Sequence, residues 1–101
     1  KGYLNTPNWL LSRVEFVDPN RITVFPNPFY SGLNIEVTHH KVKKYKLIRI
    51  DGTILNETYL EYDKKLFEIN NLEPLGKGLY ILELHLDNGL VSRIPILKSI
   101  N

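Results

Sequence analysis

The strongest structural signal in the sequence is an Asn-Gly pair between two apolar runs near its C-terminal end. From Tyr80 to Leu86 large apolar residues alternate with other side chains, a period of two that is typical of a strand rather than a helix. Asn88-Gly89 follows, and both residues tolerate the positive φ that tight hairpin turns require. A second apolar run extends from Leu90 to Lys98. Together these features predict a β-hairpin.

The register of this hairpin depends on the number of residues in its loop. A two-residue loop would place Arg93 on the same face as Leu82, whereas a three-residue loop, with Gly89 in the left-handed conformation, places Ile94 there. Because burying an arginine is costly, we predict the three-residue loop. In this register Ile96 also faces inward beside Tyr80, while Arg93 and Pro95 face away from the core.

Turn residues divide the rest of the chain into further short strands. Pro26 and Pro28 have no backbone N–H and disfavour the helical region for the preceding residue, so a strand is expected to end at Phe25. Asp51-Gly52 marks a second hairpin, whose register stays open because both of its faces carry apolar residues. The predicted strands are 21–25, 33–38, 44–50, 53–59 and 66–69, with 70–76 as a loop.

The number and spacing of these strands favour an all-β fold. There are about seven strands at intervals of roughly 8 to 12 residues, which is typical of a β-sandwich or barrel. A chain of 101 residues is long enough for one domain with a modest core. Residues 1–20 are expected to be a linker or the tail of an upstream domain, with a boundary near 18–21, because turn residues surround a single short run from Trp9 to Val17. Since the chain starts at Lys1 rather than at a methionine, we expect it to be a fragment.

Composition excludes several classes of function. The net charge of +2 is too small to indicate nucleic acid or an anionic membrane as a partner. The absence of cysteine excludes a disulfide framework and a thiolate metal site. No apolar run approaches the roughly 20 residues of a membrane span, so direct membrane insertion is not expected.

The titratable and nucleophilic residues form no recognisable catalytic or ligand-binding pattern. His39 and His40 are adjacent at a predicted strand end, so their rings face opposite sides and cannot share a metal. His85 lies between two leucines and is expected to have no acidic partner. The four serines lie outside the known nucleophile motifs, and the carboxylates are scattered. We therefore expect no enzymatic activity, no cofactor and no metal.

Two groups of surface-type residues have alternative explanations. Lys41, Lys43, Lys44 and Lys46 surround Tyr45, and interleaved basic and aromatic residues can bind nucleic acid or acidic glycans. We favour instead a solvated strand edge, where lysines oppose aggregation. Aromatic residues can also form a sugar-stacking platform, but in a small sandwich they more often fill the core and its rim. The residues concerned are Tyr3, Trp9, Tyr30, Tyr59 and Tyr62.

Four motifs in a fixed order resemble those of a known family. They are Ile22 to Pro28 followed by Leu33 to Ile35; Tyr45 to Leu55, with Gly52 at its turn; Phe67 to Leu72 followed by Gly78 to Leu82; and Asn88-Gly89 with the terminal Ile96 to Lys98. Over residues 21–98 the chain resembles the C-terminal sorting domains carried by cargo proteins of the type IX secretion system.

This resemblance implies a fold, a function and partners. It implies an immunoglobulin-like antiparallel β-sandwich over residues 21–101, placed at the C-terminus of a larger exported protein of Bacteroidetes-type bacteria. The domain would be a non-catalytic secretion signal, read by the outer-membrane type IX translocon on the way through the periplasm to the cell surface. A sortase-like peptidase would then remove it, and the upstream cargo would be joined to lipopolysaccharide. The alternative function is an accessory binding sandwich of the fibronectin or carbohydrate-binding kind.

Most residues of the matching motifs have a structural explanation first. Pro26-Asn27-Pro28 ends a strand, and the motif glycines suit unusual φ values, so recognition would fall to the surface that they position. Among segments that a partner could read directly, Leu90 to Lys98 is favoured. A last strand often lies at a sheet edge, where Pro95 fits, and an edge offers a backbone template. The recognition candidates are Pro26, Asn27, Pro28, Gly52, Gly78, Tyr80, Gly89, Arg93, Pro95 and Lys98.

Overall fold

Seven strands form the regular structure of residues 21–100, the part of the chain that this computed structural model describes. They are β1 (Ile22–Phe25), β2 (Leu33–Val37), β3 (Val42–Arg49), β4 (Ile54–Lys64), β5 (Leu66–Ile69), β6 (Gly78–Leu86) and β7 (Val91–Lys98). The all-β class predicted from the sequence is confirmed. Within these residues, no helix is both long and apolar enough to cross a membrane.

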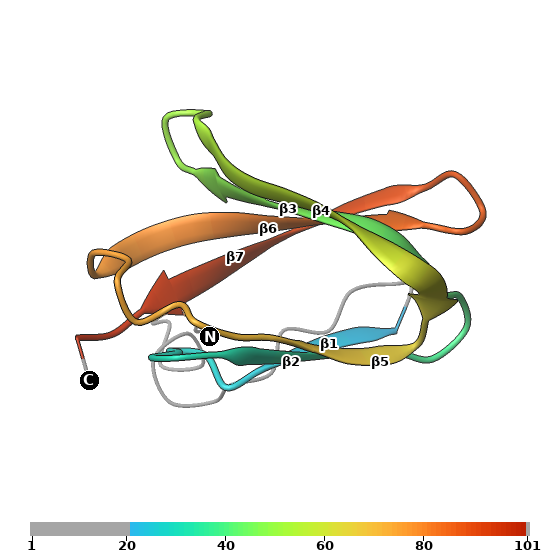
Figure 1. Cartoon of the computed structure of the whole chain (residues 1–101), viewed down its shortest axis with the longest axis horizontal. Coiled ribbons are helices and arrows are strands. Elements are labelled where there is room, and N and C mark those ends of the chain that lie inside the picture. The colour runs from blue at the N-terminus through green and yellow to red at the C-terminus, as the bar shows by residue number, and fades with distance from the viewer. Residues whose placement is uncertain (1–20, 101) are drawn as a thin grey trace, which may run out of the picture.

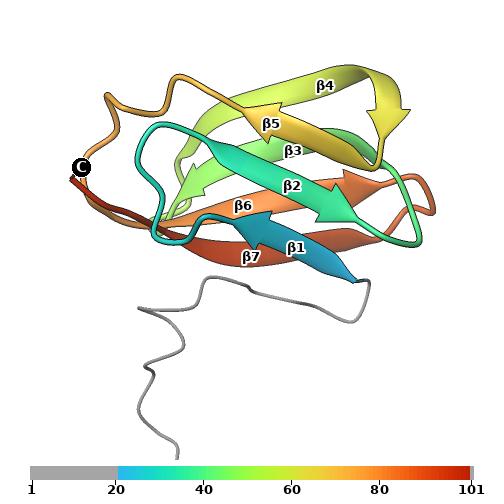
Figure 2. The same cartoon turned by 90° about the horizontal axis from the view of Figure 1, so that it is seen from below.

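The strands form two antiparallel sheets that pack face to face (Figure 1). One sheet has the order β1-β2-β5, and the other has the order β4-β3-β6-β7. The chain changes sheet after β2, after β4 and again after β5, which produces the immunoglobulin-like sandwich that the family resemblance implies. In Figure 2 the three-stranded sheet lies in front of the four-stranded one.

The core lies between the sheets and is built from alternate residues of each strand. In β7, for example, Ser92, Ile94, Ile96 and Lys98 are buried, while the residues between them are exposed or half-buried. This is the period of two that a strand imposes on its side chains. The fully enclosed apolar side chains include Ile22, Val24, Phe29, Ile35, Val42, Leu82, Leu84 and Ile96.

The predicted register of the β6–β7 hairpin is confirmed. Leu82 pairs with Ile94 and Tyr80 pairs with Ile96, so these four side chains face the core together. The Leu86 N–H donates to the Leu90 carbonyl at 2.9 Å, which leaves residues 87–89 as a three-residue loop. Gly89 has a φ of 89°, the left-handed conformation that this loop requires.

The β3–β4 hairpin differs from the sequence prediction in its limits. The strands extend over Val42–Arg49 and Ile54–Lys64 rather than 44–50 and 53–59. Two irregularities interrupt their pairing, between Val42 and Lys44 and between Leu47 and Ile48. Each bulge shifts the register and exchanges the faces of the following residues, which explains why the alternation left this register open. Gly52 turns the chain with a φ of 97°.

The predicted loop after β5 is confirmed and is anchored at both ends. Leu72 is buried, and its N–H donates to the Ser31 carbonyl at 3.0 Å. The Tyr80 hydroxyl donates to the Gly76 carbonyl at 2.7 Å. Gly78, with a φ of 138°, starts β6 directly after this loop.

The lysine-rich segment does not lie at a sheet edge, so that expectation was wrong. It belongs largely to β3, which is hydrogen-bonded to β4 on one side and to β6 on the other. Tyr45 does not join the lysines on the surface, because it is buried and stacks on Phe67 with 5.8 Å between ring centroids. Interleaved binding by Tyr45 and the lysines is therefore excluded by geometry.

The expectation that the tyrosines fill the core and its rim was also wrong for β4. Tyr59 is 71% exposed and Tyr62 is 70% exposed. Both lie on a strand whose burial pattern is mostly exposed, because β4 is the last strand on its side of the four-stranded sheet. Tyr3, Trp9 and the proposed linker over residues 1–20 lie outside the described residues.

Candidate recognition site on strand β7

Buried polar side chains gather around one strand of the sandwich. Four polar or charged residues of the described chain are buried: Asn27, Glu83, Ser92 and Lys98. Ser92 and Lys98 belong to β7, and the other two bond to it, Asn27 through the backbone and Glu83 through Arg93. Buried polar groups are far more informative than exposed apolar ones, since each must be compensated locally. They mark β7 as the candidate site.

Strand β7 lies at the edge of the four-stranded sheet, as expected. Its only strand neighbour in the sheet order is β6. Arg93 and Pro95 have their side chains on the outer face, opposite the core. Pro95 can sit in this ladder because alternate residues of an edge strand direct their N–H away from the sheet, where a missing donor costs no ladder bond.

The C-terminal half of that edge is covered by the β1–β2 loop. The Asn27 side chain accepts a hydrogen bond from the Leu97 N–H at 2.8 Å and donates one to the Pro95 carbonyl at 3.3 Å. Two residues later, the Phe29 N–H donates to the Leu97 carbonyl at 2.8 Å, and the Phe29 carbonyl accepts from the Ser99 N–H at 2.8 Å. Phe29 and Lys98 thereby form an isolated parallel bridge.

Lys98 ends β7 with its side chain on the inner face. It is only 3% exposed, and Nζ donates to the Ser99 carbonyl at 2.9 Å. Nζ also lies 4.9 Å from the centroid of the Tyr30 ring, which is a cation–π geometry. The aliphatic stem therefore extends the core to the end of the sandwich, while the ammonium is held by a carbonyl and an aromatic face.

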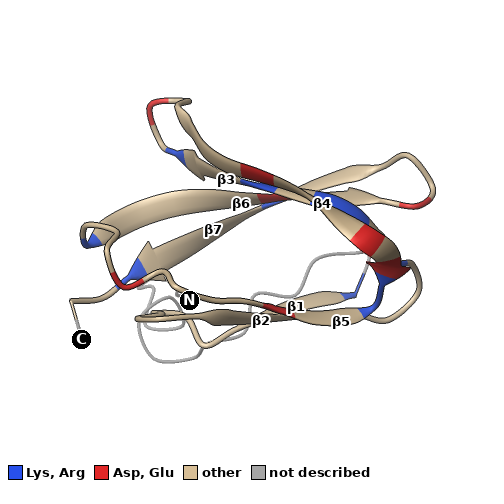
Figure 3. Cartoon of the chain, viewed as in Figure 1, with Lys and Arg blue, Asp and Glu red and all other residues tan. Residues whose placement is uncertain are grey.

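A charged ladder crosses the outer face of the same sheet. The cross-strand row runs Glu57, Lys46, Glu83 and Arg93 over β4, β3, β6 and β7, with alternating sign. Arg93 Nε donates to Glu83 Oε2 at 2.8 Å, and Lys46 Nζ is 3.7 Å from Glu83 Oε1. Figure 3 shows basic and acidic positions next to each other along these strands. Opposite charges directly across a sheet stabilise its pairing.

Glu83 is the centre of this ladder. Burial alone would raise the pKa of its carboxyl, but hydrogen bonds with His85 and Arg93 outweigh burial and hold that pKa below its ordinary value. His85 Nε2 lies 2.9 Å from Glu83 Oε1. The prediction that His85 has no acidic partner was therefore wrong, because residues two apart on a strand share a face.

Next to this row, Lys44 connects β3 to β4. Its Nζ donates to Glu57 Oε2 at 2.9 Å and to the Tyr59 hydroxyl at 3.3 Å. The hydrogen bond with Glu57 is the main reason that the pKa of Lys44 is raised, and in return that of Glu57 is lowered. Lys44 and Lys46 are thus paired with carboxylates within the sheet.

The histidines do not form a metal site. His39 and His40 lie in the bend between β2 and β3, and His40 Nδ1 is 3.3 Å from Asp87 Oδ1 of the closing hairpin. Across residues 21–100, no group of three or more histidine and carboxylate side chains is arranged to hold a metal ion.

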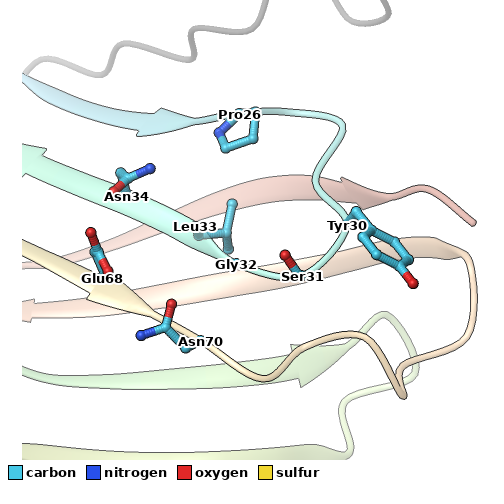
Figure 4. A pocket seen from close by; sticks show the side chains of 8 residues that line it. All are labelled: Pro26, Tyr30, Ser31, Gly32, Leu33, Asn34, Glu68 and Asn70. Atoms are coloured by element: carbon cyan, nitrogen blue, oxygen red, sulfur yellow. The ribbon is translucent and has the colours of Figure 1, made fainter. Parts of the chain in front are cut away.

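A shallow groove of about 300 Å³ lies beside the β1–β2 loop (Figure 4). It is lined by that loop, the start of β2 and the end of β5, with Tyr30 at one side and Glu68 at another. Gly32 lines this groove, and a Cβ added there would lie 3.0 Å from the Ile69 carbonyl oxygen. No convergent set of titratable groups faces this groove, so it gives no catalytic arrangement.

The structure brings most of the predicted recognition residues to one end of the sandwich. Asn27, which stands between Pro26 and Pro28 in the β1–β2 loop, bonds to the end of β7, and Gly78 pairs with Lys98. Tyr80 of β6 pairs with Arg49 of β3, and Arg49 leads into the turn that contains Gly52. Gly89 lies at the opposite end, in the β6–β7 turn (Figure 1). Arg93 lies between these ends on the outer face.

Two functional features were missed by sequence reasoning. One is the Glu83–Arg93 pair, which the predicted hairpin register already placed directly opposite each other, so it could have been found. The other is the contact between Asn27 and β7. Its two hydrogen bonds join residues that are separated by 68 and by 70 positions in the sequence. No local pattern in the sequence signals a contact of that range.

Comparisons with known proteins identify a family for the folded part of the chain. A family model described as the secretion system C-terminal sorting domain matches residues 23–98. The match begins within β1 and ends at the last residue of β7, so it coincides with the β-sandwich. A search of curated proteins found no match.

Proposed function

Because the chain belongs to the type IX secretion system C-terminal sorting domain family, we propose that it delivers an exported cargo protein to the cell surface. The family is one of sorting signals and not of catalytic domains. The cargo would be the polypeptide upstream of the sandwich, with residues 1–20 as the linker. The domain would cross the outer membrane with its cargo and itself perform no chemistry.

One observation carries this proposal: the family match spans the whole folded sandwich. The signal is therefore a folded domain and not a short linear tag. Its partners would be the outer-membrane translocon and a sortase-like peptidase that removes the domain after export. Transfer of the cargo to lipopolysaccharide would follow that cleavage.

Within the domain, we assign recognition to the surface around β7. An edge strand offers a partner its outward N–H and carbonyl groups as a template. The ten recognition candidates then fall into three groups. Gly52, Gly78, Tyr80 and Gly89 shape the backbone and the core, and Pro26, Asn27 and Pro28 form the loop that bonds to β7 through Asn27. Arg93, Pro95 and Lys98 belong to β7 itself.

An export assay tests this function. Residues 19–101 are fused to a periplasmic reporter in a bacterium that has the type IX system, and the reporter is measured in the medium and on the cell surface. We expect export that is lost when the translocon is deleted. A fusion that folds but stays in the periplasm of the intact strain would refute the proposal.

A second fusion tests the role of β7. Removing residues 90–101 is expected to abolish export, since it removes the edge strand. A matched control replaces the exposed Tyr59 and Tyr62 of β4 with Ser, which leaves β7 intact and should leave export unchanged. Export of the truncated fusion at the normal level would contradict recognition through β7.

A further inference from the structure

The Asn27 side chain takes the place of a backbone peptide group at the edge of β7. In a parallel ladder the residue opposite Ile96 would donate its N–H to the Pro95 carbonyl and accept from the Leu97 N–H. Asn27 stands two residues before Phe29, which faces Lys98, so it occupies that position. Its carboxamide makes both of those bonds, at 3.3 and 2.8 Å.

The flanking prolines explain why a side chain is needed here. Pro26 and Pro28 have no backbone N–H, so the loop has few donors to offer an edge. A carboxamide has a donor and an acceptor side by side, which suits an adjacent carbonyl and N–H on one strand. With Phe29, it satisfies four outward groups from Pro95 to Ser99. We call residues 27–29 the edge guard.

The guard is anchored too firmly to be exchanged for a partner strand. Phe29 is fully enclosed in the core, and Asn27 is only 6% exposed. Withdrawing a buried phenylalanine costs more than a few edge hydrogen bonds return. The C-terminal half of β7 is therefore closed in the folded domain.

The N-terminal half of β7 lies beyond the guard. Backbone direction alternates along a strand, so Val91 and Arg93 direct their N–H and carbonyl groups the same way as Pro95 and Leu97. These groups point away from β6, towards the edge of the sheet. Val91 is 41% exposed and the neighbouring Leu90 is 52% exposed, which gives this stretch an apolar surface. The Arg93 charge is already paired with Glu83 at 2.8 Å.

We propose that a partner strand adds to β7 at Val91 and Arg93 only, and that Asn27 sets this limit. The partner is a short extended segment of the export machinery, with an apolar side chain over Val91 and Leu90. This inference rests on the proposed function for the identity of the partner. The guard itself does not depend on that function.

Proline substitutions test the docking stretch. Val91→Pro removes an outward N–H without removing a bond to β6, whereas Val91→Ala trims the side chain and keeps the N–H. In the export fusion we expect Val91→Pro to lower export about fivefold relative to Val91→Ala, which corresponds to one net hydrogen bond. Equal export of the two variants, with the wild-type fusion exported, would overturn the proposal. Failure of the wild-type fusion would instead refute the proposed function.

Amide exchange tests the guard in the isolated 101-residue chain. Asn27→Ala is expected to speed exchange of the Leu97 amide about fivefold or more, because its acceptor is lost. The matched control is Asn34→Ala, since the Asn34 side chain bonds to the Phe25 carbonyl and does not touch β7. Unchanged protection of Leu97 in Asn27→Ala would overturn the guard.

The same variant also distinguishes guarding from direct recognition. Because the docking stretch stays intact in Asn27→Ala, its fusion is expected to be exported at the wild-type level. An unfolding midpoint measured on the isolated chain shows whether the variant is folded. Loss of export by a folded Asn27→Ala domain would mean that Asn27 is read directly, which would overturn the limit proposed here.

Discussion

Replacing Glu83 with glutamine should reveal how much the charged ladder contributes to stability. Glu83 is the buried anion of the outer face, with a side chain that is 7% exposed. Two partners lie within hydrogen-bonding distance, Arg93 Nε at 2.8 Å and His85 Nε2 at 2.9 Å. Glutamine keeps the shape and one acceptor oxygen but removes the charge, so that Lys46, His85 and Arg93 lose their common anion.

The expected loss of stability follows from the burial of Glu83 and the exposure of Arg93. Hydrogen bonds to charged groups contribute about 1.5–3 kcal/mol, but Arg93 is 68% exposed, so its contact approaches the smaller value of a surface pair. We expect Glu83→Gln to lower the free energy of unfolding by about 1–2 kcal/mol at pH 7. For a domain of this size, that loss lowers Tm by roughly 5–15 °C.

The pH dependence supplies an independent check. The pKa of Glu83 is lower in the folded chain than its ordinary value of 4.5, so its contribution is present above that value. The contribution is lost as the pH falls through the folded pKa, where the carboxyl becomes neutral like glutamine. The stability difference between wild type and Glu83→Gln should therefore be constant near neutrality and shrink below about pH 4.5.

Urea or thermal unfolding of the full chain between pH 3 and pH 7 measures both quantities. The matched control is Glu57→Gln, in the same cross-strand row, whose ion pair with Lys44 is exposed and screened and should change stability little. Equal stability of Glu83→Gln and wild type at pH 7 would refute the reasoning. A difference that persists unchanged at pH 3 would refute its electrostatic origin.

Three further substitutions test other parts of the structure. Gly89→Ala places a Cβ at a φ of 89° and should cost about 1 kcal/mol in chemical unfolding; no loss would contradict the three-residue loop. Ile94→Ala opens a cavity in the core and should cost about 2–5 kcal/mol, measured in the same way, whereas a small effect would mean that the sheets repack. Lys98→Met keeps the buried stem and removes the ammonium, so the free energy of unfolding should change by less than about 1.5 kcal/mol. Because the C-terminal half of β7 is closed, export of this fusion should stay at the wild-type level, and loss of export by a folded Lys98→Met domain would mean that the Lys98 charge is read.

The sequence alone was sufficient for the all-β class and for the closing hairpin. Alternation with a period of two and the Asn88-Gly89 turn are local signals, and they agree with the observed β6 and β7. The register could be chosen because a shift of one residue would have buried Arg93 in place of Ile94. The cost of burying a charge is a property of the residue itself, so no tertiary information was needed.

Only the tertiary structure decided which strands are neighbours and what closes the edge. The sequence suggested that the lysines of β3 lie on an edge strand, but β3 is a central strand. The order of strands in a sheet depends on pairing between distant segments, which a local pattern does not report. Irregular pairing between β3 and β4 exchanged faces within these strands, which alternation cannot report. Asn27 meets Leu97 across 70 residues, and the burial of Lys98 depends on Tyr30 and Phe29 from the same loop. Such contacts form only when the two sheets pack together, and no local pattern in the sequence indicates which distant residues will then meet.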